Sequence, residues 1–128
     1  MSSDTLSDVA SAALEKALDG TAARHRTLAN NIANVDTPGF RRREVAFHDA
    51  LRGALKSAND SEQTLARLKR VRPRKFVDRT RSARADGNTV NIETEMGELA
   101  KNTLEYEADV QLLLSKLRML RTAISGGR

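Results

Sequence analysis

The chain has 128 residues, a length that fits one domain or one small structural module. Its hydrophobic fraction is 39%, but 18 residues are alanine, only 3% are aromatic, and the formal net charge is +5. Sandwiches, barrels and doubly wound sheets need many aromatic and β-branched strand residues, so this composition excludes them.

The first predicted element is a helix over residues 6–35. From Leu14 onward, large apolar or semi-apolar side chains recur alternately four and three residues apart, the spacing of the a and d positions of a heptad. Gly20 predicts a weak point, because glycine inside a helix costs about 1 kcal/mol relative to alanine. Pro38-Gly39 predicts the end of the helix and a type II turn, since proline cannot continue a helix and glycine supplies the positive φ.

Three short elements are predicted after this turn. Alternation at Val45 and Phe47 indicates a short extended piece. Apolar residues at helical spacing then predict a short helix near residues 48–57. The polar stretch at 57–64 indicates a loop.

A strongly basic segment follows. Residues 67–84 contain nine Lys/Arg and one Asp, whereas the rest of the chain contains 13 Lys/Arg and 16 Asp/Glu. Asp86-Gly87 separates this segment from residues 89–92, where polar and apolar side chains alternate. This pattern predicts either a β-hairpin or, because of the charge, a mobile loop. The basic patch comprises Arg67, Lys69, Arg70, Arg72, Arg74, Lys75, Arg79, Arg81 and Arg84.

The clearest helical pattern lies near the end of the chain. Over residues 96–124, side chains of the apolar stripe step alternately three and four residues without a break. Glutamates crowd the start and basic residues the end, which complements the helix macrodipole. Asn91 or Thr94 is suited to cap the start of this helix, and Gly126-Gly127 to end it.

These elements predict a mainly α fold. Two long terminal helices of matched length would pair as an antiparallel coiled coil, with a short helix and a loop or β-hairpin in the middle, packed at one end. The predicted parts of this single structural module are the N-terminal long helix (1–35), an insert with the turn, short helix and basic segment (36–92), and the C-terminal long helix (93–128).

The predicted pair has more apolar surface than two helices need. Leu104, Leu112 and Leu114 widen the stripe of the last helix, so we expect neighbouring molecules to cover it. The predicted assembly seam comprises Leu14, Leu18, Leu28, Ile32, Met96, Leu99, Tyr106, Val110, Leu113, Leu117, Leu120 and Ile124.

Nothing in the sequence predicts catalysis. No glycine-flanked nucleophile or phosphate-binding glycine loop is present, and cysteine is absent. The two histidines, His25 and His48, have no metal-ligand spacing. We therefore expect no enzyme activity, no cofactor and no metal. No stretch is long and apolar enough for a membrane span, and no cleavable signal peptide is visible.

The basic patch leaves two function classes open. Nine cations could neutralise phosphates, so a basic coiled-coil nucleic-acid-binding protein is one hypothesis. Against it, the segment has one aromatic residue for stacking, and Pro73 breaks any continuous basic helix. The other hypothesis is an arginine-rich loop that contacts acidic protein surfaces or acidic lipid head groups, with the glutamates at 93–98 as a protein partner.

The run of residues 29–40 resembles the signature of bacterial flagellar rod, hook and hook-associated proteins. Its asparagines suit a helix end, and Asn31 and Asn34 are also candidates for bonds across subunits. The small size and the residues around 43–47, 86–96 and 99–106 are most similar to the short proximal rod type within the flagellar basal body rod protein family. The motif residues are Ala29, Asn30, Asn31, Ile32, Ala33, Asn34, Asp36, Thr37, Pro38, Gly39 and Phe40.

This resemblance implies a structural subunit of the flagellar basal body rod. Such a subunit would be exported by the flagellar type III apparatus without a cleaved signal and would polymerise in the periplasmic space through its terminal helices. The implied partners are itself, a FlgC-like rod subunit, the adaptor FliE and proteins of the MS ring and export gate.

Overall fold

The computed structural model describes residues 3–56 and 60–126, which form four helices and two strands. Helix α1 spans Ser3–Ala33, strand β1 Arg43–Ala46, helix α2 His48–Lys56, helix α3 Ser61–Arg70, strand β2 Arg74–Val77 and helix α4 Ile92–Ile124. The chain is mainly helical, as predicted.

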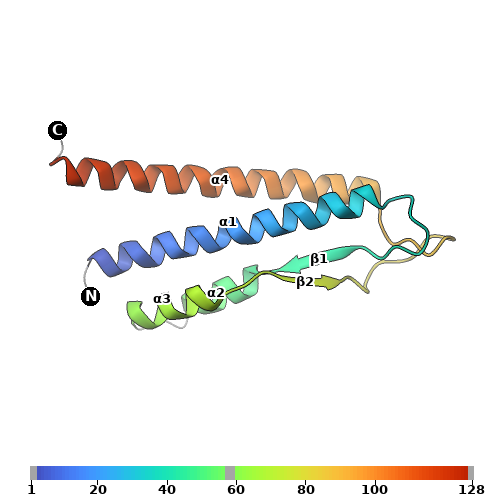
Figure 1. The fold of residues 1–128 in the computed structure, drawn as a ribbon, viewed down its shortest axis with the longest axis horizontal. Helices are drawn as coiled ribbons and strands as arrows, with labels where there is room; N and C mark the ends of the chain where they lie inside the picture. The colour runs from blue at the N-terminus through green and yellow to red at the C-terminus, as the bar shows by residue number, and fades with distance from the viewer. Residues whose placement is uncertain (1–2, 57–59, 127–128) are drawn as a thin grey trace.

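The two terminal helices run antiparallel along one another (Figure 1). They contain 31 and 33 residues, which confirms the prediction of two long helices of matched length. The side chain of Asn91 caps α4 by accepting a hydrogen bond from the N–H of Thr94 at 3.1 Å. At its other end Gly126 has a φ of +69°, the left-handed conformation that ends a helix; Gly127 lies outside the described residues.

The middle of the chain lies along α1, on the side away from α4 (Figure 1). We expected it at one end of the helix pair, and this expectation is wrong. The physical reason is a second apolar face on α1: Val9, Ala12 and Ala13 pack against a cluster formed by Ala54 of α2 with Leu68 and Val71 at the end of α3. Burial of this face holds α2 and α3 against the first half of α1.

Helix α3 begins inside a stretch that we predicted as a loop. Asp60 caps it by accepting a hydrogen bond from the N–H of Glu62 at 3.0 Å. Its buried face consists of Ser61, Thr64 and Leu68. Only two large apolar side chains, Leu65 and Leu68, mark the helical period, and the polar residues 57–64 before them favoured the prediction of a loop. The rest of that predicted loop, residues 57–59, lies outside the described residues.

The β-hairpin differs from the predicted one. Strand β2 pairs antiparallel with β1, with Arg43 opposite Val77 and Ala46 opposite Arg74. The turn at Asp86-Gly87 does form, with Gly87 at a φ of +83°, but residues 89–92 add no strand to it. They lead directly into α4 instead.

The predicted weak point in α1 is absent, because the helix is continuous through Gly20. Gly20 is buried beneath the Phe47 ring, and a Cβ atom at this position would lie 2.2 Å from the ring. Glycine is therefore required for the close approach of the β1–α2 connection to α1, and not for a break in the helix.

This contact generates a stability prediction. Gly20→Ala should lower the free energy of unfolding by about 1–3 kcal/mol, because the Phe47 ring must move. Gly97→Ala is the matched control, since a Cβ atom there meets nothing within 4 Å on helix α4. That change should stabilise the protein by about 0.5–1 kcal/mol. Thermal unfolding followed by circular dichroism compares the two variants; equal melting temperatures would contradict the role assigned to Gly20.

Candidate functional site: the motif junction and the apolar seam

The motif folds into the end of α1 and the turn that follows it. Phe40 N–H donates to the carbonyl of Thr37 at 3.2 Å, and Gly39 has a φ of +72°, which confirms the predicted turn. The side-chain amide of Asn34 donates to the carbonyl of Asn30 at 2.8 Å, and its oxygen accepts from the Thr37 hydroxyl at 3.1 Å. These bonds are local, as expected for asparagine at a helix end.

Asn88, far away in the sequence, completes this helix end. Its buried side-chain amide donates to the carbonyls of Asn34 at 2.9 Å, Val35 at 3.1 Å and Thr37 at 2.8 Å. Arg84 donates to the carbonyls of Val35 and Val90. Together they bind carbonyls of the turn that follows α1 and tie this turn to the segment before α4. Sequence patterns contain no signal for this role of Asn88.

Asn31 links the motif to both β1 and α4. Its amide donates to the carbonyl of Arg43 at 2.8 Å and to Glu95 Oε2 at 3.1 Å, while its oxygen accepts from the N–H of Arg43 at 2.9 Å. The side chain is fully buried. Asn31 therefore bonds within the chain, and its candidacy for a bond across subunits is corrected.

A charged network lies beside Asn31. Arg42 Nε lies 2.5 Å from Glu95 Oε1, and both side chains are only 1% exposed. The same guanidinium contacts Asp78 Oδ2 at 2.7 Å and Glu44 Oε2 at 3.2 Å. Arg24 on α1 extends the network, with Glu44 Oε1 at 2.9 Å and Glu98 Oε2 at 2.7 Å. Two arginines thus join α1, β1, the end of β2 and α4.

The pKa values of this network favour its charged form. Burial opposes the charge of Arg42, but the hydrogen bonds and charge of Glu95 outweigh it and raise the pKa of the guanidinium. Burial likewise acts to raise the pKa of Glu44, yet hydrogen bonds from Arg24 and other donors lower it overall. Hydrogen bonds from Thr80, with a contribution from Arg42, lower the pKa of Asp78 to about 2.

This network changes the interpretation of the acidic start of α4. We expected the glutamates at 93–98 to pair with the basic patch. Glu95 and Glu98 instead contact Arg42 and Arg24, which lie outside that patch. Glu95 and Glu98 are therefore not the partners of the basic patch within the chain.

The face of α4 that turns toward the rest of the chain contains a polar stripe. Glu95, Asn102 and Asp109 recur seven residues apart and are buried or half-buried. Asn102, for example, donates to the carbonyl of Thr21 on α1 at 2.8 Å. One half of the apolar seam, which includes Met96 and Leu117, follows this stripe by one residue, which is about 100° of rotation, so it faces away from the polar contact. The other half, with Leu99, Tyr106 and Leu113, follows the stripe by four residues, which is about 40° of rotation, so it flanks the contact with α1.

Much of the seam is exposed. On α4, Met96 is 54%, Leu117 52% and Ile124 87% exposed. On α1, by contrast, Leu28 is fully buried. The remaining seam residues are either half-buried (Leu14, Leu18, Ile32, Leu99, Val110 and Leu113) or exposed (Tyr106 and Leu120).

Comparison with known proteins agrees with the motif. Residues 13–41 match a family model described as flagella basal body rod protein. The chain is 30% identical to flagellar basal body rod protein FlgB of Bacillus subtilis, over 90% of this chain and 92% of that protein. It is 34% identical to FlgB of Aeromonas hydrophila, over 86% of this chain and 88% of that protein. The chain belongs to the flagellar basal body rod protein family.

Membership confirms the predicted resemblance, and it makes the chain a structural subunit of the rod and not an enzyme. It also favours this function over the nucleic-acid-binding alternative. Among the residues that the structure describes, no helix has the length and apolar character of a membrane span, and no cluster of three or more metal-ligating side chains occurs.

The exposed part of the motif forms one end of the rod subunit. Asn31 is buried, and Ile32, Asn34 and Phe40 are half-buried. The other motif residues are exposed: Ala29, Asn30, Ala33, Asp36, Thr37, Pro38 and Gly39. The motif therefore combines internal bonds, through Asn31 and Asn34, with a surface that is free in the single chain.

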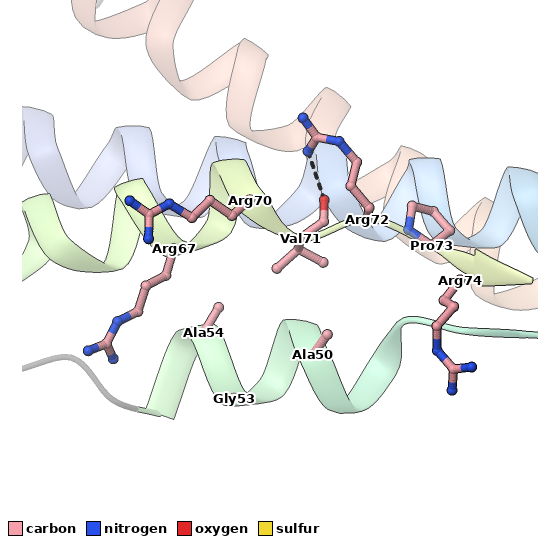
Figure 2. A pocket seen from close by; sticks show the side chains of 9 residues that line it. All are labelled: Ala50, Gly53, Ala54, Arg67, Arg70, Val71, Arg72, Pro73 and Arg74. Atoms are coloured by element: carbon pink, nitrogen blue, oxygen red, sulfur yellow. Dashed lines mark hydrogen bonds between the residues drawn. The ribbon is translucent and has the colours of Figure 1, made fainter.

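All nine residues of the basic patch are exposed, but they do not form one continuous surface. They are distributed over α3, β2 and the loop that leads to Asp86. Arg84 lies at the motif junction, where it donates to the carbonyl of Val35. Arg67, Arg70, Arg72 and Arg74 line a groove between α2 and the α3–β2 connection (Figure 2).

The buried network generates a second prediction. Glu95→Gln should lower the free energy of unfolding by about 3–5 kcal/mol, because it removes a charged partner of the buried Arg42 guanidinium. Glu93→Gln, an exposed position on the same turn of α4, should change it by no more than about 0.5 kcal/mol. Urea unfolding of both variants measures the difference, and a small effect of Glu95→Gln would show that the network contributes little.

A third prediction concerns the loss of stability at low pH. Because the folded pKa of Asp78 is lowered to about 2 from its ordinary 3.8, its contribution to stability is present above about pH 4 and is lost as the pH falls toward 2. Asp78→Asn should remove this part of the acid destabilisation. Asp49→Asn is the control, since that side chain is 98% exposed. Melting temperatures between pH 5 and pH 2 compare both variants with wild type, and an unchanged profile for Asp78→Asn would contradict the assignment.

Proposed function

We propose that this rod subunit polymerises through the apolar seam of α4. The observation that carries the proposal is the exposure of much of this seam in the single chain, Met96, Leu117 and Ile124 above all. The polar stripe with Glu95 and Asn102 contacts the subunit's own α1, whereas the seam with Met96 and Leu117 remains exposed. Exposed apolar stripes of this extent mark surfaces that bind other proteins.

The motif end supports the same function. Its exposed residues project from a junction that Asn31, Asn88 and the Arg42 network hold rigidly. A rigid end is suited to repeated contacts in a helical assembly, because less conformational entropy is lost when neighbours bind. We infer that these residues contact the next subunit along the rod.

Placement and partners follow from the family resemblance. We propose that the subunit is exported by the flagellar type III apparatus without a cleaved signal and occupies the proximal rod in the periplasmic space. Its proposed partners, besides itself, are a FlgC-like rod subunit, the adaptor FliE, and proteins of the MS ring and export gate. Family membership supports this placement.

The test places charge on the seam. Leu117→Asp with Ile124→Asp should abolish rod assembly and motility, since a carboxylate buried between subunits costs several kcal/mol. Both side chains are exposed in the single chain, so its free energy of unfolding should change by no more than about 0.5 kcal/mol. The measurements are swimming and recovery of basal bodies from a strain that contains each version as its only copy.

The control adds the same charge elsewhere on α4. Gln111→Asp with Ser115→Asp introduces two aspartates at exposed polar positions of the same helix. This variant should assemble and swim nearly normally. Equal motility of the two double variants would show that the seam is not the assembly surface.

A further inference from the structure

The groove between α2 and the α3–β2 connection has no partner in the single chain. It is shallow and open to solvent, has a volume of about 740 Å³ and is lined in part by Ala54, Val71 and Pro73, so part of its lining is small and apolar. Figure 2 shows Arg67 and Arg74 extending toward α2 at the two ends of the groove, while Arg72 turns away and donates to the carbonyl of Val71. The groove is thus an apolar trough with positive charge at both ends.

Two of the four arginines that line the groove, Arg70 and Arg74, have no carboxylate partner within the part of the chain that the structure describes. None of the ion pairs there includes Arg70 or Arg74. The cations that line the groove are all arginine, although lysine serves a solvated surface equally well. Arginine binds carboxylates through a planar fork and is less strongly hydrated than lysine, which suits it to protein interfaces. The chemistry of the groove therefore fits an acidic protein segment.

The chain exposes a segment of this kind. Asp8, Glu15 and Asp19 are seven and four residues apart on α1, so they lie on one face of the helix. All three are exposed, and no ion pair among the described residues includes them. We name this face the acidic flank.

The subunit cannot place its own acidic flank in its own groove. Val9 and Ala13, on a neighbouring face of α1, pack against the cluster of α2 and α3. This contact holds α1 in place and directs the acidic flank elsewhere.

We propose that the arginine groove of one subunit binds the acidic flank of α1 of a second copy. The groove and the flank are different surfaces, so the contact is heterologous and each copy leaves one free surface of each kind. Such contacts propagate into open helical assemblies, which is the geometry a rod requires. The proposal adds a second, electrostatic interface to the apolar seam and rests on the proposed function.

Charge reversal with rescue tests this contact. Arg70→Glu with Arg74→Glu reverses two of the four charges of the groove, and Glu15→Arg with Asp19→Arg reverses two of the three charges of the flank. Each purified variant alone should self-associate at least about tenfold more weakly than wild type in sedimentation velocity at low salt. An equimolar mixture of the two should associate again, because the unchanged acidic flank of the groove variant can bind the unchanged groove of the flank variant.

Two controls keep the result specific. Lys69→Glu with Arg79→Glu makes the same charge change outside the groove and should leave association within about threefold of wild type. Circular dichroism should show the same helix content for every variant. The proposal is overturned if wild type stays monomeric, if the mixture does not associate, or if the control is as damaging as the groove reversal.

Two further readouts separate this contact from other possibilities. Loss of duplex DNA binding in the groove variant, with self-association unchanged, would assign the groove to nucleic acid and overturn the proposal. Normal motility of both charge-reversal variants, with motility lost in Leu117→Asp with Ile124→Asp, would overturn this contact and leave the seam intact. Loss of motility in the charge-reversal variants, regained when groove and flank are reversed in one chain, supports it.

Discussion

The buried pair of Arg42 and Glu95 is the interaction on which the arrangement of the other elements depends. Both side chains are excluded from water, and such a pair tolerates burial only when further hydrogen bonds satisfy its remaining atoms. Asn31 supplies one of these bonds from α1, and Asp78 another from the end of β2. Because the partners come from four separate segments, the network forms only when all of them are in register. It therefore specifies one orientation of α1, the two strands and α4 relative to one another.

This polar contact explains why the subunit leaves its apolar seam exposed. Side chains such as those of Glu95 and Asn102 join the two helices, so only part of the neighbouring apolar seam is half-buried in the contact. The seam is then available for contacts between subunits. A chain that buried the seam internally would be more stable alone but would have little apolar surface left to offer a neighbour.

The motif has both an internal and an external role in this arrangement. Asn31 and Asn34 close the end of α1, while Pro38 and Gly39 reverse the chain and direct it toward β1. Asn88 then binds three carbonyls of the same junction from the other end of the insert. The exposed motif residues are held by this internal frame, which links the signature of the family to a rigid end of the subunit.

The sequence by itself determined the two long helices, the short helix α2, the turn at Pro38-Gly39 and the membership in the rod family. Heptad spacing, proline and glycine determine local structure over a few residues, so their effects can be predicted without knowledge of the tertiary structure. Only the tertiary structure decided the strand partner of residues 43–46, the presence of α3, the reason for Gly20 and the face of α4 that contacts α1. Each of these depends on residues far apart in the chain. The contact face of α4 could not be predicted for a further reason. It includes the polar stripe of Glu95, Asn102 and Asp109, and a polar stripe beside a strong apolar one has no hydropathy signal of its own.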